Sequence, residues 1–273
     1  MNLVEIFSYS FMLRALIVGL LISICSALIG VPLVLRKNSM LGDGLSHTAF
    51  SAFAIAAVLG FAPLWIALPI TIISSFFVLR LSKSNGKNHK ISGDAAIAIL
   101  SASSLAIGTM AISIAKGVNI DLNSYLFGSI LAVNWGDVIA SSILAAIVIA
   151  IFIFTFHRIF AITFDEEFAR SIGIKTNIYD TIFAIICSAV IVLGMRLLGS
   201  LLISSLIIFP TLSAMSLAKT FKNTTVLAVI ISVLAFILGL ITSFLATTPT
   251  GATVVIVNLV IFIFIKLVKN ILN

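Results

Sequence analysis

An acidic and an imidazole side chain stand four residues apart in the segment Gly42-Asp43-Gly44-Leu45-Ser46-His47. In a helix this spacing places Asp43 and His47 on one face, with Cβ atoms about 5 to 6 Å apart. A carboxylate oxygen and an imidazole nitrogen together suit Zn²⁺ or Mn²⁺. The structural alternative makes Asp43 the N-cap of a helix and His47 a hydrogen-bonded core residue. The spacing by itself leaves both interpretations open.

A second distinctive stretch runs from Phe164 to Gly173, with the sequence FDEEFARSIG. Acidic residues at its start favour the N-terminal end of a helix, small Ala169 permits close approach, and Gly173 can end the helix. The pattern predicts a short amphipathic helix. Such a helix either docks in a groove on a partner protein or is a solvated loop segment.

Two motifs that would indicate an enzyme are missing from the sequence. It contains no Gly-x-x-x-x-Gly-Lys-Ser/Thr segment, so we expect no P-loop for nucleotide phosphates, and no His-Glu-x-x-His pair of a metalloprotease. We therefore expect that the chain is not an enzyme. If ATP drives its activity, another subunit binds and hydrolyses the ATP.

The elements that position these residues must be membrane helices. Of the 273 residues, 61% are hydrophobic and only 9% are charged, whereas soluble domains carry about 25% charged residues. The apolar runs are long enough for helices rather than barrel strands. We expect an all-α membrane protein in which residues 1–273 form a single transmembrane domain.

Charges, glycines and prolines divide the chain into eight or nine transmembrane helices. The predicted spans are Phe11–Leu35, His47–Gly60, Leu64–Leu79, Ala95–Ala115, Val138–Phe156, Ile178–Met195, Leu197–Leu217, Thr225–Leu245 and Ala252–Ile265. Two connections are longer than the others. The outer loop Lys116–Asp137 is predicted to hold an interfacial or re-entrant helix, and the inner loop His157–Asn177 is the most polar stretch of the chain.

The basic residues indicate how the chain is oriented, because short positively charged loops stay in the cytoplasm. Thirteen of the 16 Lys and Arg residues fall in alternate connections, and only Arg14, Lys116 and Arg196 fall on the other side. We expect the N-terminus outside, the C-terminus inside, and an odd number of spans. The net charge of +7 then reflects topology, and the scattered basic residues indicate no nucleic-acid partner.

Four segments in order resemble the membrane permeases of metal-ion ABC importers, the zinc and manganese group called ABC-3. They are Leu35–His47, Asp165–Ile174, Gly199–Pro210 and Pro249–Ala252. The resemblance implies that Asp43 and His47 are the metal-coordinating pair on the translocation route. It also implies that Glu167, Ala169 and Gly173 belong to the coupling loop, residues 158–177, where Asp165 also matches. Gly44 departs from the family's frequent alanine without touching either ligand.

The family also implies how such a chain works with others. Similar permeases are homodimers in the plasma membrane lipid, bound to two cytoplasmic ABC ATPase subunits and supplied by an extracytoplasmic metal-binding protein. Zn²⁺ or Mn²⁺ would be the transported substrate, with no permanently bound cofactor, and the Gly-Asp-Gly-Leu-Ser-His wording favours zinc over manganese.

Two other functions remain as alternatives. One is an ion-coupled secondary transporter or channel that needs no ATPase, although few acidic residues fall inside the spans to couple protons or sodium. The other is an ABC permease for chelated metals. Asp43 and His47 argue against it, because a chelated metal arrives with its ligands filled.

Overall fold

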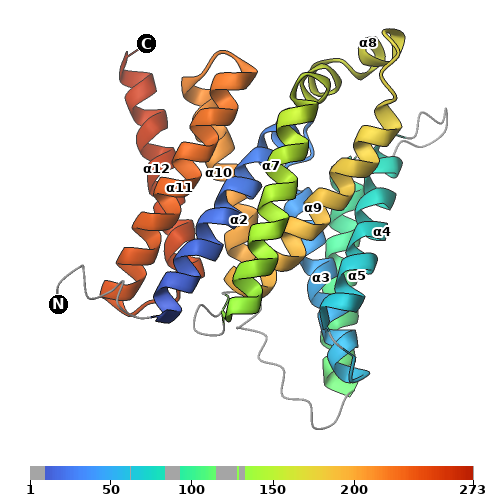
Figure 1. The fold of residues 1–273 in the computed structure, drawn as a ribbon, viewed down its shortest axis with the longest axis vertical. Helices are drawn as coiled ribbons and strands as arrows, with labels where there is room; N and C mark the ends of the chain where they lie inside the picture. The colour runs from blue at the N-terminus through green and yellow to red at the C-terminus, as the bar shows by residue number, and fades with distance from the viewer. Residues whose placement is uncertain (1–9, 62, 84–92, 115–127, 129–132, 273) are drawn as a thin grey trace.

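The computed structural model describes residues 10–61, 63–83, 93–114, 128 and 133–272, and every regular element in this part of the chain is a helix (Figure 1). The all-α prediction is therefore confirmed. The helices are α2 (Ser10–Leu35), α3 (Leu41–Val58), α4 (Pro63–Lys83), α5 (Gly93–Ile114), α7 (Trp135–Phe164), α8 (Glu166–Ser171), α9 (Thr176–Leu198), α10 (Ser200–Leu217), α11 (Phe221–Ala246) and α12 (Thr250–Leu272).

Seven of these helices, namely α2, α5, α7, α9, α10, α11 and α12, are long and apolar enough to cross a membrane. Helix α4 contains a shorter apolar stretch, Leu64–Leu79. Helix α3 has the length to span, but Asp43, His47 and its hydroxyl residues lower its hydropathy. With α3 and α4, the described part of the chain has nine long helices, the upper figure of the prediction.

Several helices extend beyond their predicted bounds. Helix α3 begins at Leu41 rather than His47, and α12 continues to Leu272 rather than ending at Ile265. Helix α7 continues through His157 and Arg158 to Phe164. Its 30 residues correspond to about 45 Å, compared with about 30 Å for a hydrocarbon core. Polar residues mark where a helix leaves the lipid, not where its backbone hydrogen bonding stops.

Residues 158–177, predicted to form the coupling loop, are largely helical. They consist of the last turns of α7, the short helix α8, and the beginning of α9. The predicted helix within the outer loop concerns residues that lie outside the described part of the chain, apart from Gly128. At the end of that loop, the side chain of Asn134 accepts a hydrogen bond from the Asp137 backbone, and Asp137 reciprocates, so a capping box starts α7.

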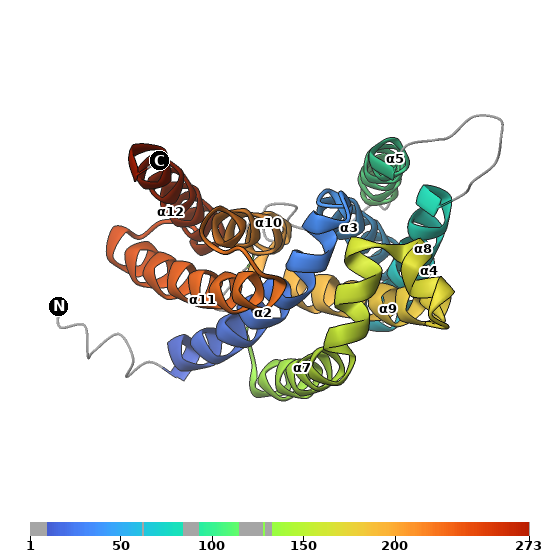
Figure 2. The same cartoon turned by 90° about the horizontal axis from the view of Figure 1, so that it is seen from above.

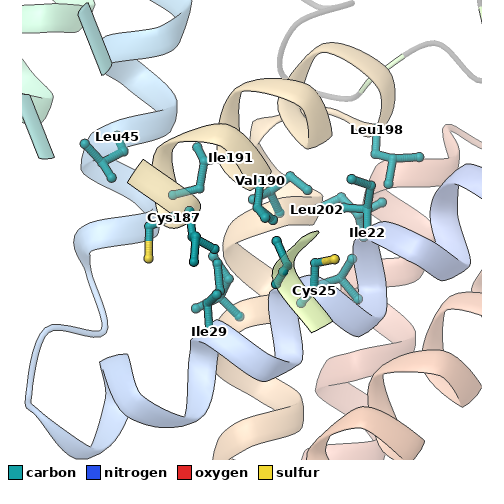
Figure 3. Close-up of a cluster of buried hydrophobic side chains, with 14 of the residues drawn as sticks. Ile22, Cys25, Ile29, Leu45, Cys187, Val190, Ile191, Leu198 and Leu202 are labelled. Carbon is teal, nitrogen blue, oxygen red and sulfur yellow. The ribbon is translucent and has the colours of Figure 1, made fainter. Parts of the chain in front are cut away.

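The centre of the bundle is a buried cluster between α2, α9 and α10. Figure 3 shows Ile22, Cys25 and Ile29 of α2 beside Cys187, Val190 and Ile191 of α9 and Leu202 of α10. Gly30 allows α2 and α10 to approach closely, because a Cβ at this position would lie 2.4 Å from the Ile207 carbonyl oxygen.

The bundle presents an apolar surface outward, as a lipid-facing protein must. On α7, Ile139, Ile143 and Ile147 recur every four residues and are exposed, so they share one face of the helix. The start of α2 and the end of α12 lie at opposite ends of the bundle, and α8 lies at the same end as the end of α12 (Figure 1).

The close contact at Gly30 predicts a large packing defect in Gly30→Val. The added side chain would collide with backbone, which cannot rotate away, so we expect destabilisation of at least about 1–3 kcal/mol. Thermal unfolding of the detergent-solubilised protein checks this. Ala146→Val on the exposed face of α7 is the matched control, and equal melting temperatures for the two variants would contradict the packing argument.

Candidate functional site

The first turn of α3 carries Asp43, but not as its cap. Met40 is the N-cap residue and makes no side-chain capping hydrogen bond, whereas Asp43 stands in the first turn. A carboxylate there interacts favourably with the positive end of the helix dipole. The capping role of Asp43 in the structural alternative is therefore wrong, although its charge still suits this position.

Asp43 and His47 lie together on one face of α3, as their spacing predicts. His47 Nε2 is 3.6 Å from Asp43 Oδ2, and the side chains are 19% and 38% exposed respectively. In the stretch of α3 from Leu41 to Ala54, all residues except Asp43 and His47 are buried. This stretch of the helix thus opens to its surroundings only at the two side chains that can bind a metal ion.

Two glycines explain why neighbouring helices approach α3 so closely at this point. A Cβ on Gly42 would lie 2.9 Å from Ile207 of α10, and a Cβ on Gly44 would lie 2.7 Å from Ile97 of α5. Because successive residues are 100° apart in a helix, Asp43 projects between the directions of these two contacts. The view from above shows α3 between α10 and α5 (Figure 2).

Side-chain hydroxyl groups form hydrogen bonds in the same part of α3, one to a neighbouring helix and one within α3 itself. Thr48 shares a 3.2 Å hydrogen bond with Ser104 of α5, and Ser46 donates to the Asp43 carbonyl oxygen at 2.7 Å. Among the described residues, no third His, Cys, Asp or Glu joins Asp43 and His47 to make a group of three. The described part of one chain therefore offers a pair of ligands rather than a complete coordination shell.

The geometry of the pair is compatible with metal coordination. Two ligand atoms bound at about 2.1 Å to one tetrahedral Zn²⁺ are roughly 3.4 Å apart. The observed separation is 3.6 Å, so small side-chain movements suffice to bring both atoms onto one ion.

The other predicted site residues surround α8. Asp165 is the N-cap of α8, and its Oδ1 accepts a hydrogen bond from the Phe168 backbone at 2.8 Å. Glu167 is exposed on the first turn. Ala169 is buried against the chain itself, where its carbonyl oxygen accepts a hydrogen bond from the backbone of Ile174. The buried position of Ala169 leaves its side chain no exposed surface.

Gly173 makes the turn between α8 and α9. Its φ of +87° is a conformation that side-chain-bearing residues avoid, and no atom lies within 4 Å of where a Cβ would be. Glycine is therefore required here by the backbone conformation and not by a lack of space for a side chain. Sequence reasoning overlooked the exposed Phe168 and Ile172, 57% and 56% accessible, which give α8 an apolar contact surface beside its acidic residues.

Sequence reasoning also missed a further ion pair. Arg36 Nη1, just after α2, lies 3.0 Å from Asp180 Oδ1 near the start of α9, and both side chains are largely buried. In the sequence, Arg36 is one of the basic residues that indicate topology and lies within the family-like segment Leu35–His47, and no local pattern predicts a partner for this side chain. The clue was Asp180 itself, an acidic residue within a predicted apolar span, which needs a partner in the membrane.

Comparison with known proteins places this chain in a family. The model of the ABC 3 transport family matches residues 8–269. The chain is 31% identical over 255 residues to the high-affinity zinc uptake system membrane protein ZnuB of Haemophilus influenzae, covering 93% of this chain and 96% of the relative. It is also 31% identical over 258 residues to the manganese import system permease protein ScaB of Streptococcus gordonii, covering 93% and 90%.

A solved structure has the same fold. PsaBC from Streptococcus pneumoniae, determined in complex with Fab, superimposes with a TM-score of 0.84 at 26% identity, covering 97% of this chain and 95% of that chain. Nearly the whole length is thus matched in both sequence and structure. The chain belongs to the ABC 3 transport family and is a multi-pass membrane permease of the metal-importing ABC type.

Proposed function

We propose that this chain is the permease subunit of an ATP-driven importer that moves a divalent metal ion into the cytoplasm, with zinc favoured over manganese. The observation that carries the proposal is the Asp43–His47 pair, which is 3.6 Å apart and partly exposed on the otherwise buried stretch Leu41–Ala54 of α3. Placing two such polar side chains within a membrane protein costs free energy, so their presence is a reason to expect a function for them.

The preference for zinc rests on coordination chemistry, because the relatives include both zinc and manganese systems. For a given set of nitrogen and oxygen ligands, divalent zinc binds more tightly than manganese in the Irving–Williams order. The Asp43–His47 separation also matches two ligands on a tetrahedral ion, the geometry that zinc prefers. This preference for zinc requires no thiolate or other ligand softer than imidazole.

A homodimer would complete the metal site. One chain supplies one carboxylate and one imidazole, whereas Zn²⁺ takes four ligands. A twofold axis beside the face of α3 that carries these residues would bring a second Asp43 and His47 to the same ion. The exposed fractions of these side chains in a single chain, 38% and 19%, leave them accessible to that second copy.

Helix α8 is the proposed contact with a cytoplasmic ABC ATPase. Its acidic first turn and its exposed Phe168 and Ile172 present charge and apolar area on one small element, which suits docking into a cleft. Asp165 and Gly173 would set the shape of this element, and Glu167 would face the partner. ATP-driven movement of the ATPase subunits would then alternate access to Asp43 and His47.

The orientation follows from this assignment and from the basic residues. With α8 in the cytoplasm, the end of α12 lies inside and the start of α2 outside, since they are at opposite ends of the bundle. The outer ends of the helices would then receive metal from an extracytoplasmic binding protein.

The ligand assignment predicts that Asp43→Ala and His47→Ala each lower metal uptake at least about tenfold, because each removes one ligand worth more than about 1.4 kcal/mol. Assembly with the ATPase should persist, since both side chains are partly open. Radiometal uptake into proteoliposomes containing the whole complex measures the effect. His157→Ala, at the inner end of α7, is the matched control, and uptake at the normal rate in either site variant would remove Asp43 and His47 from the route.

The docking assignment predicts that Glu167→Lys and Gly173→Val release the ATPase subunit or uncouple it. The first reverses a charge at the contact, and the second distorts the turn after α8 by roughly 1–2 kcal/mol of backbone strain. Co-purification of the ATPase, together with metal-stimulated ATP hydrolysis, checks both. Lys222→Glu, an exposed charge reversal at the start of α11, should leave both unchanged; if it weakens co-purification equally, α8 is not the specific contact.

The zinc preference predicts asymmetric competition in the wild-type complex. The concentration of unlabelled Zn²⁺ that halves Mn²⁺ uptake should be at least about tenfold lower than the concentration of unlabelled Mn²⁺ that halves Zn²⁺ uptake, because zinc binds more tightly. Uptake assays with each radiometal and the other ion as competitor measure the ratio. The reverse asymmetry would assign manganese as the substrate while leaving the importer assignment intact.

A further inference from the structure

The described helices contain an ion pair that the metal site and α8 do not explain. We propose that Arg36 and Asp180 are positioning residues, and that their ion pair transmits movement of α8 to the helix that carries Asp43 and His47. The inference rests on the proposed function, because it concerns how ATP-driven movement reaches the metal.

The pair joins two segments that are far apart in sequence. Arg36 Nη1 lies 3.0 Å from Asp180 Oδ1, and the side chains are only 14% and 12% exposed. A pair so removed from water is not expected to add much stability, because desolvation offsets the attraction, but breaking it leaves an uncompensated charge. The two segments are therefore strongly held to one relative position.

On one side, Asp180 belongs to the first turns of α9, which are fastened to α8. Arg170 of α8 donates to the Thr176 hydroxyl oxygen at 3.0 Å and also pairs with Glu166 at 2.6 Å. Thr176 and Asp180 are both buried and four residues apart, so they share a face of α9. A displacement of α8 thus reaches Asp180 through one rigid helical turn.

On the other side, Arg36 belongs to the tight turn that leads into α3. The backbone of Asn38 donates to the Leu33 carbonyl at 2.9 Å, and that of Lys37 donates to the Val34 carbonyl at 3.1 Å. Lys37 has a φ of +60°, and together these features form a Schellman C-cap. The backbone of Leu41 then donates to Asn38 at 3.1 Å, so the turn passes directly into the first turn of α3, where Asp43 stands.

The ion pair lies where three helices meet. A small cleft of about 20 Å³ is lined by residues that include Pro32, Arg36, Ile159, Tyr179 and Asp180. Tyr179 accepts a hydrogen bond from Arg158 of α7. The inner ends of α2, α7 and α9 therefore meet at this cleft, and α7 leads directly into α8.

A second ion pair provides an internal comparison. Arg196 lies 3.4 Å from Asp137, and their side chains are 38% and 8% exposed. It joins the last turn of α9 to the first turn of α7, at the opposite ends of those helices from α8. If ion pairs merely hold this bundle together, both pairs should behave alike on substitution.

The test uses the complete importer in proteoliposomes and measures metal uptake and ATP hydrolysis in the same samples. We expect Arg36→Ala and Asp180→Asn to retain assembly and hydrolysis but to lower uptake per ATP about tenfold, within the usual range of coupling between sites. Exchanging the charges in Arg36→Asp with Asp180→Arg should recover most of the ratio. Arg196→Ala should leave it unchanged.

Three results would overturn the inference: an unchanged ratio in both single variants, an equal fall in Arg196→Ala, or single variants that fail to assemble and are not recovered by the exchange. The last result would indicate that the ion pair contributes only to the folding or assembly of the protein. Failure of the wild-type complex to transport either zinc or manganese would instead overturn the proposed function, so the two failures are distinguishable.

Discussion

A charged side chain among hydrocarbon tails costs roughly 2.5 to 3.5 kcal/mol on insertion scales, and this cost governs where the polar groups of this chain lie. Arg36 is paired with Asp180, and Arg196 with Asp137. Asp43 faces His47 on a helix that is shielded from lipid by α4, α5, α9 and α10. Each of these acidic residues within the bundle therefore has a partner of opposite or complementary charge in reach.

The position of α3 follows from the same constraint. A helix carrying Asp43, His47 and several hydroxyl groups is poorly suited to face lipid, and α4, α5, α9 and α10 pack around it. Gly42 and Gly44 let α10 and α5 pack against its backbone while Asp43 stays between them. The result is a face on which the two candidate metal ligands, Asp43 and His47, are screened from lipid and remain partly exposed.

The periodicity and length of the apolar runs were enough to predict a helical membrane bundle, and the spacing of Asp43 and His47 was enough to predict their contact. The pattern from Phe164 to Gly173 similarly predicted α8, which runs from Glu166 to Ser171. Helix ends were less predictable. Hydropathy reports the boundary of the lipid, whereas helices such as α7 continue through it for as long as their internal hydrogen bonds are satisfied.

The sequence by itself determined which residues are suited to membrane, metal and partner contact, because composition, short-range spacing and dipole effects act within one or two helical turns. Only the tertiary structure decided which of them meet. Arg36 and Asp180 are 144 residues apart, and no local pattern links them; their contact depends on how α2 and α9 pack. The close approach of α5 and α10 to α3 at Gly44 and Gly42 is likewise a property of the assembled bundle rather than of any one helix.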